Sequence, residues 1–505
     1  MAKGEASAVQ LVQTYLDGIE KIDRNGPRLN SVIELNPDAL SIAEALDREL
    51  AAGTLRGSLH GIPILIKDNI DTGDKMTTTS GSLALEGSYA ERDAFLVDRL
   101  RQAGAVILGK TNLSEWANFR SDHSTSGWSS RGGQTRNPYA LDRNPCGSSS
   151  GSAVAVAANL CAAAIGTETD GSIVCPSQAN GIVGMKPTLG LVSRSGVIPI
   201  AHSQDTAGPM ARTVEEAAIL LGALTGIDEH DPATLDSQDR AFGDYTQFLD
   251  PGGLRGSRIG VARSYFEFDG RVAKLMDSCL ELMKQKGAEL VDPVELMDES
   301  KLSKSELEVL YYEFKADLNA YLAGLGPGAA VHSLQEIIQF NEQHKERAMP
   351  YFLQERMVKA QSKGPLSQKK YINALERNLR LSRTGGIDKV LAEHRLDAIV
   401  APTGGPAWLT DPVQGDHFSG GGFSSLAAVA GYPHITVPAG TIFGLPVGIS
   451  FFASAWSEPA LIRLAYAFER ASQVRQPPKF LPTAEVSLDA ARRALKTSQN
   501  QRIRI

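Results

Sequence analysis

The chain is 505 residues long, with 42% hydrophobic residues, 22% charged residues and a formal net charge of −7. This length allows two to four average domains or one large α/β body, and the composition is that of an ordinary globular protein. The acidic balance gives no electrostatic reason to expect nucleic acid or an anionic membrane as a partner.

The N-terminal and C-terminal segments contain few residues that indicate a function. The first residues lack the apolar segment of a secretory signal, and the run 154–165 is too short and too rich in alanine to span a bilayer. A cytoplasmic enzyme fits this pattern, as does an exported enzyme whose leader has been removed. The basic cluster at 492–504 lies in a C-terminal stretch, 486–505, that we expect to be a flexible tail.

Hydrophobic spacing predicts the first elements. Apolar residues at helical intervals indicate helices over 7–22 and 40–50. The segment 61–67 (G-I-P-I-L-I-K) is a short continuous apolar run, which fits a buried strand that ends in a lysine. A helix over 94–103 and a second buried strand over 105–108 follow.

The stretch 144–176 is the centre around which we expect the chain to be organised. A glycine- and serine-rich loop at 146–152 opens an alanine-rich helix, and we expect this helix to run to a second small-residue loop at 166–172. Both loops offer backbone N–H groups and hydroxyls. Such a layout suits a site that stabilises an oxyanion beside a nucleophile.

The remaining elements complete an α/β pattern. Strands that alternate with helices predict a mixed, largely parallel sheet, and the absence of a linker or repeat favours a single domain over 1–485. Its core would be 60–230, and 303–395 would be a helical, cap-like region. The other predicted elements are helices at 214–224, 272–284 and 459–471 and strands at 258–262, 397–401, 434–439 and 447–452.

The cysteines and histidines do not indicate a metal or a disulfide scaffold. The four cysteines are few and scattered and form no C-x-x-C pair, and free cysteines in such small-residue regions usually pack as small hydrophobes. The nine histidines show neither H-E-x-x-H nor close pairing with cysteines. We therefore expect no metal and no cofactor.

Two segments match the motifs of other kinds of site, a phosphate-binding loop and a nucleophile elbow. The segment 104–111 (G-A-V-I-L-G-K-T) fits the phosphate-loop pattern, but Ala-Val-Ile-Leu prefers an extended, buried conformation, so we interpret it as a strand and a turn. The segment 147–151 (G-S-S-S-G) fits a nucleophile elbow centred on Ser149, which needs a hydrophobic strand before it and has a loop instead. A triad with His202, His417 or His434 stays open at this point.

A third candidate joins Lys67 with Ser148 and Ser172. An exposed lysine with a pKa near 10.4 is neutral about once in 2,500 molecules at pH 7, a cost of roughly 4.6 kcal/mol for its use as a base. Burial can lower a lysine pKa to about 5–6 and remove that cost. Neutral Lys67 could then draw a proton from one serine, directly or through the other. A surface ion pair is the alternative role for this lysine.

At these residues the sequence resembles the amidase signature family. The lysine in G-I-P-I-L-I-K-D-N, the loop G-S-S-S-G and the block G-T-E-T-D-G-S-I (166–173) occur in the family's order, with its two serines 24 residues apart (172 − 148). Within the family the chain resembles most the bacterial branch that removes the C-terminal amide of peptides. Segments across nearly the whole chain carry that likeness, among them 28–40, 109–120, 131–139, 204–212 and 455–459.

The resemblance implies a role for each matching position. Ser172 matches the acylated nucleophile, Ser148 the relay serine on a cis peptide bond, and Lys67 the base. The backbone N–H groups that match the oxyanion hole are those of Thr169, Asp170, Gly171 and Ser172. The resemblance also implies a large twisted mixed sheet of about eleven strands between helices, with Asn118, Phe119 and Ser149 as candidate substrate-binding residues and with 118–125 and 311–321 as possible pocket walls.

The implied activity is hydrolysis of carboxylic amides through an acyl-enzyme, with a peptide C-terminal amide as substrate and ammonia as product. Most relatives have glycine at position 170 and many have arginine at position 174, where this chain has Asp170 and Val174. An aryl-acylamidase or general acylamidase would use the same three residues. A tRNA amidotransferase A-type subunit would need partner subunits, and a non-catalytic binding module would not need all three. The expected partners are the amide substrate, no nucleic acid and no membrane, for a monomer or homodimer.

Overall fold

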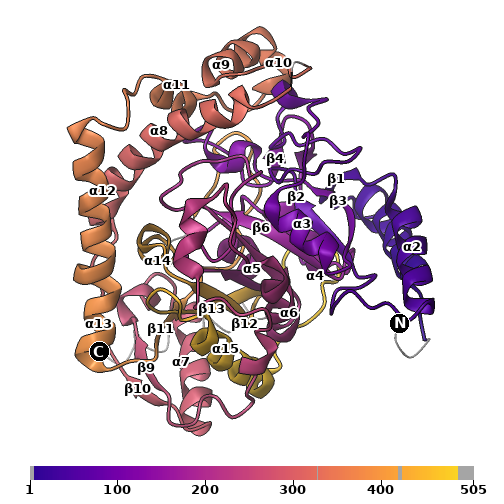
Figure 1. Ribbon diagram of the computed structural model, residues 1–505. Helices are drawn as coiled ribbons and strands as arrows, with labels where there is room; N and C mark the ends of the chain where they lie inside the picture. Colours follow the sequence, from indigo (N-terminus) through magenta and orange to yellow (C-terminus); the bar gives the residue numbers. More distant parts are fainter. Residues whose placement is uncertain (1–4, 327, 419–422, 487–505) are drawn as a thin grey trace.

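The computed structural model describes residues 5–326, 328–418 and 423–486. Within them, eleven strands form one sheet in the order β1-β3-β2-β6-β8-β7-β12-β13-β11-β9-β10. Helices pack on both sides of this sheet (Figure 1), and separate hydrophobic clusters fill the two faces. The large mixed sheet between helices is thereby confirmed. In the described part of the chain, every helix is too short or too polar to cross a lipid bilayer.

Most elements that were predicted have bounds within a few residues of the prediction, but β1, β6, β7, β8 and β10 were not predicted as strands. The strands of the large sheet are β1 (Val32–Leu35), β2 (Pro63–Lys67), β3 (Val106–Thr111), β6 (Ala163–Glu168), β7 (Val183–Lys186), β8 (Thr206–Ala211), β9 (Arg258–Val261), β10 (Glu289–Val291), β11 (Ala398–Pro402), β12 (His434–Ile442) and β13 (Leu445–Phe452). The short pair β4 (Trp128–Ser129) and β5 (Gly133–Gln134) forms a second sheet.

The helices flank the sheet and build one outer layer. They are α1 (Ala8–Gly18), α2 (Ala39–Ala51), α3 (Phe95–Gln102), α4 (Ser150–Ala157), α5 (Val174–Ala179), α6 (Val214–Leu224), α7 (Gly270–Gln285), α8 (Ser300–Ala323), α9 (Leu334–Gln343), α10 (Lys345–Ala348), α11 (Glu355–Gln361), α12 (Lys369–Ser382), α13 (Asp388–His394), α14 (Ser425–Ala430) and α15 (Glu458–Ser472). Helix α6 has the predicted bounds because Thr213 and Glu216 form a capping box at its start.

The sheet is less parallel than its sequence pattern predicts. Among the described residues, four of the ten neighbouring strand pairs are parallel, and these lie towards the two ends of the sheet. The centre, from β6 to β11, is antiparallel, and β12 and β13 form a hairpin. The prediction of a largely parallel sheet was wrong because alternating strands and helices do not reveal that β8 runs opposite to β6 and β7, or that β12 runs opposite to β7 and β13.

Strand β2 is apolar throughout because both of its faces are covered. Ile64 and Ile66 pack in the cluster with α3 and α6, whereas Leu65 packs in the cluster with α1, α2 and α4. Side chains alternate along a strand, so Lys67 lies on the same face as Leu65. That face is the one against which α4 packs, and this alternation directs Lys67 towards the start of α4.

The alanine-rich helix is shorter than predicted. Helix α4 ends at Ala157, and Asn159 adopts a left-handed conformation (φ 57°) that turns the chain back. The following residues form β6, which inserts between β2 and β8. The prediction of one helix from the first loop to the second was wrong because sheet pairing on both sides outweighs the helical preference of Ala162–Ala164. Both loops therefore meet at one end of the sheet.

The region 303–395 is helical, as its spacing predicts. Helix α8 runs over the segments that contain Trp116, Phe119 and Ile200, and Phe314 and Leu318 of α8 pack against them. Helices α9, α11 and α12 contact one another or α8 and form the outer layer at the top and left of Figure 1. The division into core, cap and tail stays a prediction, and 487–505 lies outside the described residues.

The cysteine prediction was wrong in one respect. Cys146 and Cys175 form a disulfide, while Cys161 and Cys279 are free and buried. The bond connects the loop before α4 to helix α5, across a sequence separation of 29 residues. Their separation hides the pairing in the sequence, because it arises only when β6 brings the second loop back beside the first.

We expect loss of this disulfide to lower stability, because the bond restricts the unfolded chain. For a loop of this length the loss is about 3–4 kcal/mol. Denaturation of Cys175→Ala measures it, with Cys279→Ala as the control at a free, buried cysteine. In denaturant without reductant, two thiols of the wild type should react with an alkylating agent, and four after reduction. Four reactive thiols before reduction would contradict the disulfide.

Candidate active site

Lys67 and the two serine loops meet at the carboxyl ends of two parallel strands. Strand β2 ends at Lys67 and its parallel neighbour β6 ends at Glu168. Ser148 lies just before α4, and Ser172 lies between β6 and α5. Loops at the carboxyl ends of adjacent parallel strands form a cleft, so the topology itself places these three residues in one region.

Lys67 is fully buried and its ammonium nitrogen is hydrogen-bonded to hydroxyl and carbonyl oxygens. Nζ lies 2.7 Å from Ser148 Oγ, 2.9 Å from Thr167 Oγ1 and 3.2 Å from Thr167 O. Asn69 Nδ2 donates to the same Thr167 hydroxyl at 3.0 Å and fixes its orientation. A surface ion pair, the alternative for Lys67, is therefore excluded.

Burial lowers the pKa of Lys67 to about 7, although the nearby carboxyl groups of Asp205 and Glu168 oppose this shift. Two other lysines are also fully buried, so burial alone does not distinguish Lys67. Lys110 donates to a backbone carbonyl and a threonine hydroxyl, and Lys186 donates to a backbone carbonyl. Of these three, Lys67 is the one that bonds to a serine beside a cavity.

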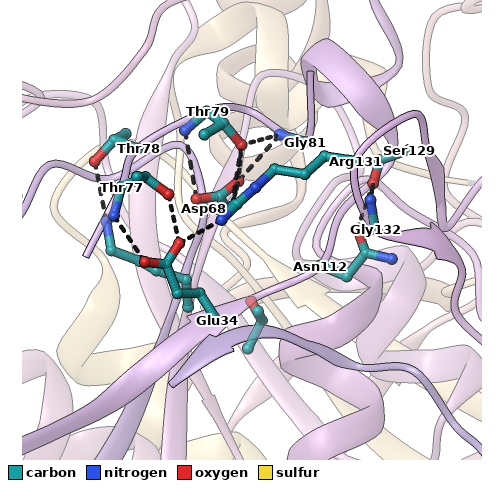
Figure 2. A network of polar contacts seen from close by, with 12 residues as sticks. Glu34, Asp68, Thr77, Thr78, Thr79, Gly81, Asn112, Ser129, Arg131 and Gly132 are labelled. Carbon is teal, nitrogen blue, oxygen red and sulfur yellow. Dashed lines mark hydrogen bonds and ion pairs between the residues drawn. The ribbon is translucent and has the colours of Figure 1, made fainter. Parts of the chain in front are cut away.

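The residue after Lys67 fixes the end of β2 through a charge network. Asp68 is fully buried and accepts hydrogen bonds from the hydroxyl and N–H of Thr79, and Arg131 Nη1 lies 3.6 Å from Asp68 Oδ2 (Figure 2). Arg131 also pairs with Glu34 of β1 at 2.5 Å. Because removal of one partner would leave a buried charge unpaired, this network holds β2 in place.

The first loop turns sharply at Ser148. The Gly147–Ser148 peptide bond is cis, and a Cβ at position 147 would collide with Ser114 Oγ, so only glycine fits there. Ser149 is fully buried: its hydroxyl donates to Thr167 O at 3.0 Å and accepts from Thr167 N at 3.2 Å. Ser149 therefore holds the threonine that faces the lysine, and its burial does not fit the predicted contact with substrate.

The second loop, 168–174, is closed on itself by a carboxylate. Glu168 accepts hydrogen bonds from the backbone N–H groups of Ile173 at 2.7 Å and Val174 at 3.1 Å. Gly171 adopts φ 77°, a left-handed conformation that favours glycine, and a Cβ there would crowd Ser424. The loop is thereby held in one shape, with Ser172 at its end.

Further contacts tie this loop to its surroundings. Thr169 Oγ1 donates to Asp205 at 2.6 Å, and Asp205 is held in turn by the N–H groups of residues 200 and 201. Ser149 N donates to Ser172 O at 3.2 Å, which joins the two loops directly. In the described residues Ser148 Oγ bonds to Lys67 and makes no hydrogen bond to Ser172 Oγ.

A cavity of about 350 Å³ opens over the second loop. Its lining includes the predicted oxyanion residues and Ser172, together with Asn118 and Phe119, whereas Ser149 lies outside it. Asn118 follows two further left-handed residues, which turns this short segment towards the cavity. The described residues that line it are Ala117, Asn118, Phe119, Ser126, Cys146, Gly147, Thr169, Asp170, Gly171, Ser172, Cys175, Ile200, Glu306, Leu307, Leu310, Arg356, Trp408, Asp416, Phe418 and Ser424.

Of the possible pocket walls, residues 118, 119 and 310 fit the predicted regions or lie beside them. Trp408 and Phe418 have ring centroids 5.1 Å apart and were not predicted from the sequence, nor was Glu306. They come from segments far from the signature residues and lack a motif. The sequence offers one signal for a further residue near the site. The segment 204–212 resembles the family and contains Asp205, the carboxylate that holds Thr169.

The three candidate histidines lie in other contacts. His434 is buried, its pKa falls to about 3, and it bonds to Ser450. His417 pairs with Asp411. In the described residues none of them bonds to Ser148, Ser149 or Ser172, which removes the geometric support for a histidine triad.

His202 belongs to a cluster with Glu313 and Asp317 that has the residue types of a metal site. Its Nδ1 lies 2.8 Å from Asp317, and its Nε2 lies 3.5 Å from Glu313. A metal ion would need one ring nitrogen and both carboxylates on the same side. Because a different ring nitrogen faces each carboxylate, the cluster is an ion pair between the 202–205 segment and α8.

Comparison with known proteins places this geometry in a family. The amidase family model matches residues 10–462. The solved structure of the native peptide amidase from Stenotrophomonas maltophilia is 52% identical, with a TM-score of 0.89, and the alignment covers 95% of this chain and 96% of that chain. A probable amidase of Arabidopsis thaliana is 44% identical over 94% of this chain and 88% of its own length.

A more distant structure, a bacterial aryl acylamidase of the amidase signature family, is 26% identical with a TM-score of 0.77, over 94% of each chain. The family model and the close relatives span nearly the whole of the described fold, including the loops that carry the lysine and both serines. The chain therefore belongs to the amidase signature family and is an amide hydrolase.

Proposed function

We propose that the chain hydrolyses amides through an acyl-enzyme on Ser172, with Lys67 as base and Ser148 as proton relay. The observation that carries this proposal is the 2.7 Å contact between Lys67 Nζ and Ser148 Oγ in a fully buried setting. With a pKa of about 7, Lys67 is neutral in about half of the molecules at neutral pH. A neutral amine accepts the proton that a serine must lose to become a nucleophile.

Acylation begins when Ser172 Oγ attacks the carbonyl carbon of the amide. The Ser172 proton passes to Ser148 Oγ as the Ser148 proton passes to Lys67 Nζ. This route requires Ser172 Oγ to face Ser148 once substrate is bound. The carbonyl oxygen becomes an oxyanion, and backbone N–H groups of residues 169–172 are suited to bind it because the closed loop is already held in shape.

Collapse of the tetrahedral intermediate completes the first half. The C–N bond breaks, and the nitrogen takes a proton from Ser148, which regains one from the Lys67 ammonium. The amine or ammonia leaves and the acyl group stays on Ser172. A water molecule then loses a proton along the same path and attacks the ester. The ester C–O bond breaks, Ser172 Oγ regains the proton from Lys67 by way of Ser148, and the carboxylic acid leaves.

We infer that the substrate is a primary amide at the C-terminus of a peptide. The 52% identity to a peptide amidase over nearly the whole chain supports this inference more strongly than the 26% identity to an aryl acylamidase supports an anilide. The size of the cavity fits a side chain with adjoining backbone, and Trp408 and Phe418 offer apolar surface at the cavity for the peptide. These features agree with a substrate longer than a simple amide.

Incubation with peptide amides, peptide anilides and free glutamine tests this substrate. We expect ammonia from the peptide amides at rates well above the release from the other two classes, and none from Ser172→Ala. Ser172→Ala should keep the fold, because the hydroxyl makes no hydrogen bond in the described structure. Release from anilides alone would exclude the peptide-amide substrate and retain the mechanism.

The pH dependence of kcat/KM tests the role of Lys67. Because the neutral amine is the active form, the rate should rise by roughly tenfold from pH 6 to pH 8, around a pKa of about 7. Lys67→Ala should lower kcat by roughly 10³-fold or more with the fold retained. Lys67→Arg separates the effect of a positive charge from that of a base. Because an arginine cannot give up its proton, this variant should also be inactive.

Two sets of variants serve as controls for Lys67. Lys75→Ala changes an exposed lysine that pairs with Asp38 and should keep the wild-type rate. Separate substitutions of His202, His417 and His434 should also leave turnover intact where the protein folds. A folded Lys67→Ala variant with wild-type activity, or turnover lost with one of the histidines, would contradict the lysine mechanism.

A further inference from the structure

A buried glutamate of the outer helical layer contacts the loop that carries the candidate oxyanion hole. Glu306 lies on α8 and lines the cavity together with Asp170 and Ser172, and only 7% of its surface is exposed. The carboxyl group of Asp170 lies close to that of Glu306 in the cavity lining and, in addition to burial, raises the pKa of Glu306. Glu306 Oε1 also accepts a hydrogen bond from Gln204 Nε2 at 3.1 Å.

Asp170 already has two hydroxyl donors. Ser424 Oγ lies 2.5 Å from one of its carboxylate oxygens and Ser425 Oγ lies 2.6 Å from the other. Both carboxylate oxygens of Asp170 therefore already act as hydrogen-bond acceptors. Two carboxyl groups in contact need a proton between them, so Glu306 supplies it.

The charges around Glu306 agree with a neutral carboxyl group. Burial and the charge of Asp170 raise the pKa of Glu306 well above its usual value, and Glu299 adds to this. Burial also raises the pKa of Glu299, to about 8. Glu168 closes the same loop by accepting hydrogen bonds from Ile173 and Val174, and the Lys186 cation lowers the pKa of Glu168 against the effect of burial.

A second link runs through Gln204. Its Nε2 donates both to Glu306 and, at 3.2 Å, to the backbone carbonyl of Thr169. Glu306 thus contacts the loop at two neighbouring residues, once by its side chain and once through the amide of Gln204. A glycine at position 170 would offer no carboxylate for the first of these contacts.

We propose that Glu306 is a positioning residue that acts as a protonated carboxylic acid, donating to Asp170 and accepting from Gln204. It thereby fixes, from α8, the backbone N–H groups that bind the oxyanion. This inference rests on the proposed function. Loss of the proton would place a second negative charge against Asp170, which pushes the loop away and disfavours a developing oxyanion nearby.

Two substitutions separate this role from simple packing. Glu306→Gln keeps one donor and one acceptor and cannot ionise, so it should retain activity within a few-fold. Glu306→Ala removes both contacts and should lower kcat by roughly tenfold or more, with a smaller change in KM. Glu308→Ala is the matched control, since Glu308 lies on the same helix, pairs with Lys363 and Lys370, and should keep wild-type kinetics.

The pH profile gives the decisive readout. For the wild type we expect kcat to fall at alkaline pH, above the rise due to Lys67, as Glu306 loses its proton. Glu306→Gln should abolish this fall, whereas Glu299→Gln should keep it, which separates the two buried glutamates. Persistence of the fall in Glu306→Gln, or its absence from the wild type, would overturn the proposal.

The same measurements distinguish failure of this inference from failure of the proposed function. A wild-type protein that releases neither ammonia nor amine from the substrate panel would count against the proposed function. An active wild type together with a folded Glu306→Ala variant of unchanged kcat would count against Glu306 alone. If Glu306→Ala does not fold, the alkaline limb of Glu306→Gln decides.

Discussion

The structure depends on the burial of one ammonium group at the end of a strand. Lys67 has no exposed surface, and its hydrogen-bond partners are two hydroxyls and a carbonyl; among the described residues no carboxylate bonds to its nitrogen. Desolvation therefore lowers its pKa, and the attraction of more distant carboxylates only limits the shift. A carboxylate bonded directly to Nζ would keep the lysine charged and would remove its basicity.

The carboxylates in the neighbourhood of Lys67 bond to other groups and not to its nitrogen. The carboxylates near Lys67 are occupied by other donors: Glu168 by the N–H groups that close its own loop, and Asp205 by Thr169. Asp68, the residue next to the lysine, is paired with Arg131. Each of these carboxylates fixes a loop while leaving the lysine to the serine hydroxyl, so one set of contacts serves both geometry and basicity.

Much of this could be predicted from local sequence. The apolar run up to Lys67 predicts the buried strand, alternation places the lysine on the side of α4, and the small-residue loops mark the serines. The sequence does not reveal the features that depend on contacts between segments far apart in the chain. Strand β6 was predicted as helix because its alanines carry no strand signal, the Cys146–Cys175 bond depends on that strand, and Glu306 reaches the site from a helix 134 residues beyond Ser172 (306 − 172).

The cavity has two sides, one built from local sequence motifs and one built from segments far away in the sequence. One side comes from residues 117–119, from Cys146 and Gly147 before Ser148, and from the loop after β6 with Ser172, which lie in or beside the segments that resemble the family. The opposite side comes from α8 and α11 and from Trp408, Asp416, Phe418 and Ser424, which carry no family motif. In the proposed function, the reaction type is therefore set by local segments, and substrate selection depends on how the helical layer packs over the sheet. Asp170 is where the two sides meet, since it belongs to the loop after β6, accepts a hydrogen bond from Ser425 of α14 and lies close to Glu306 of α8.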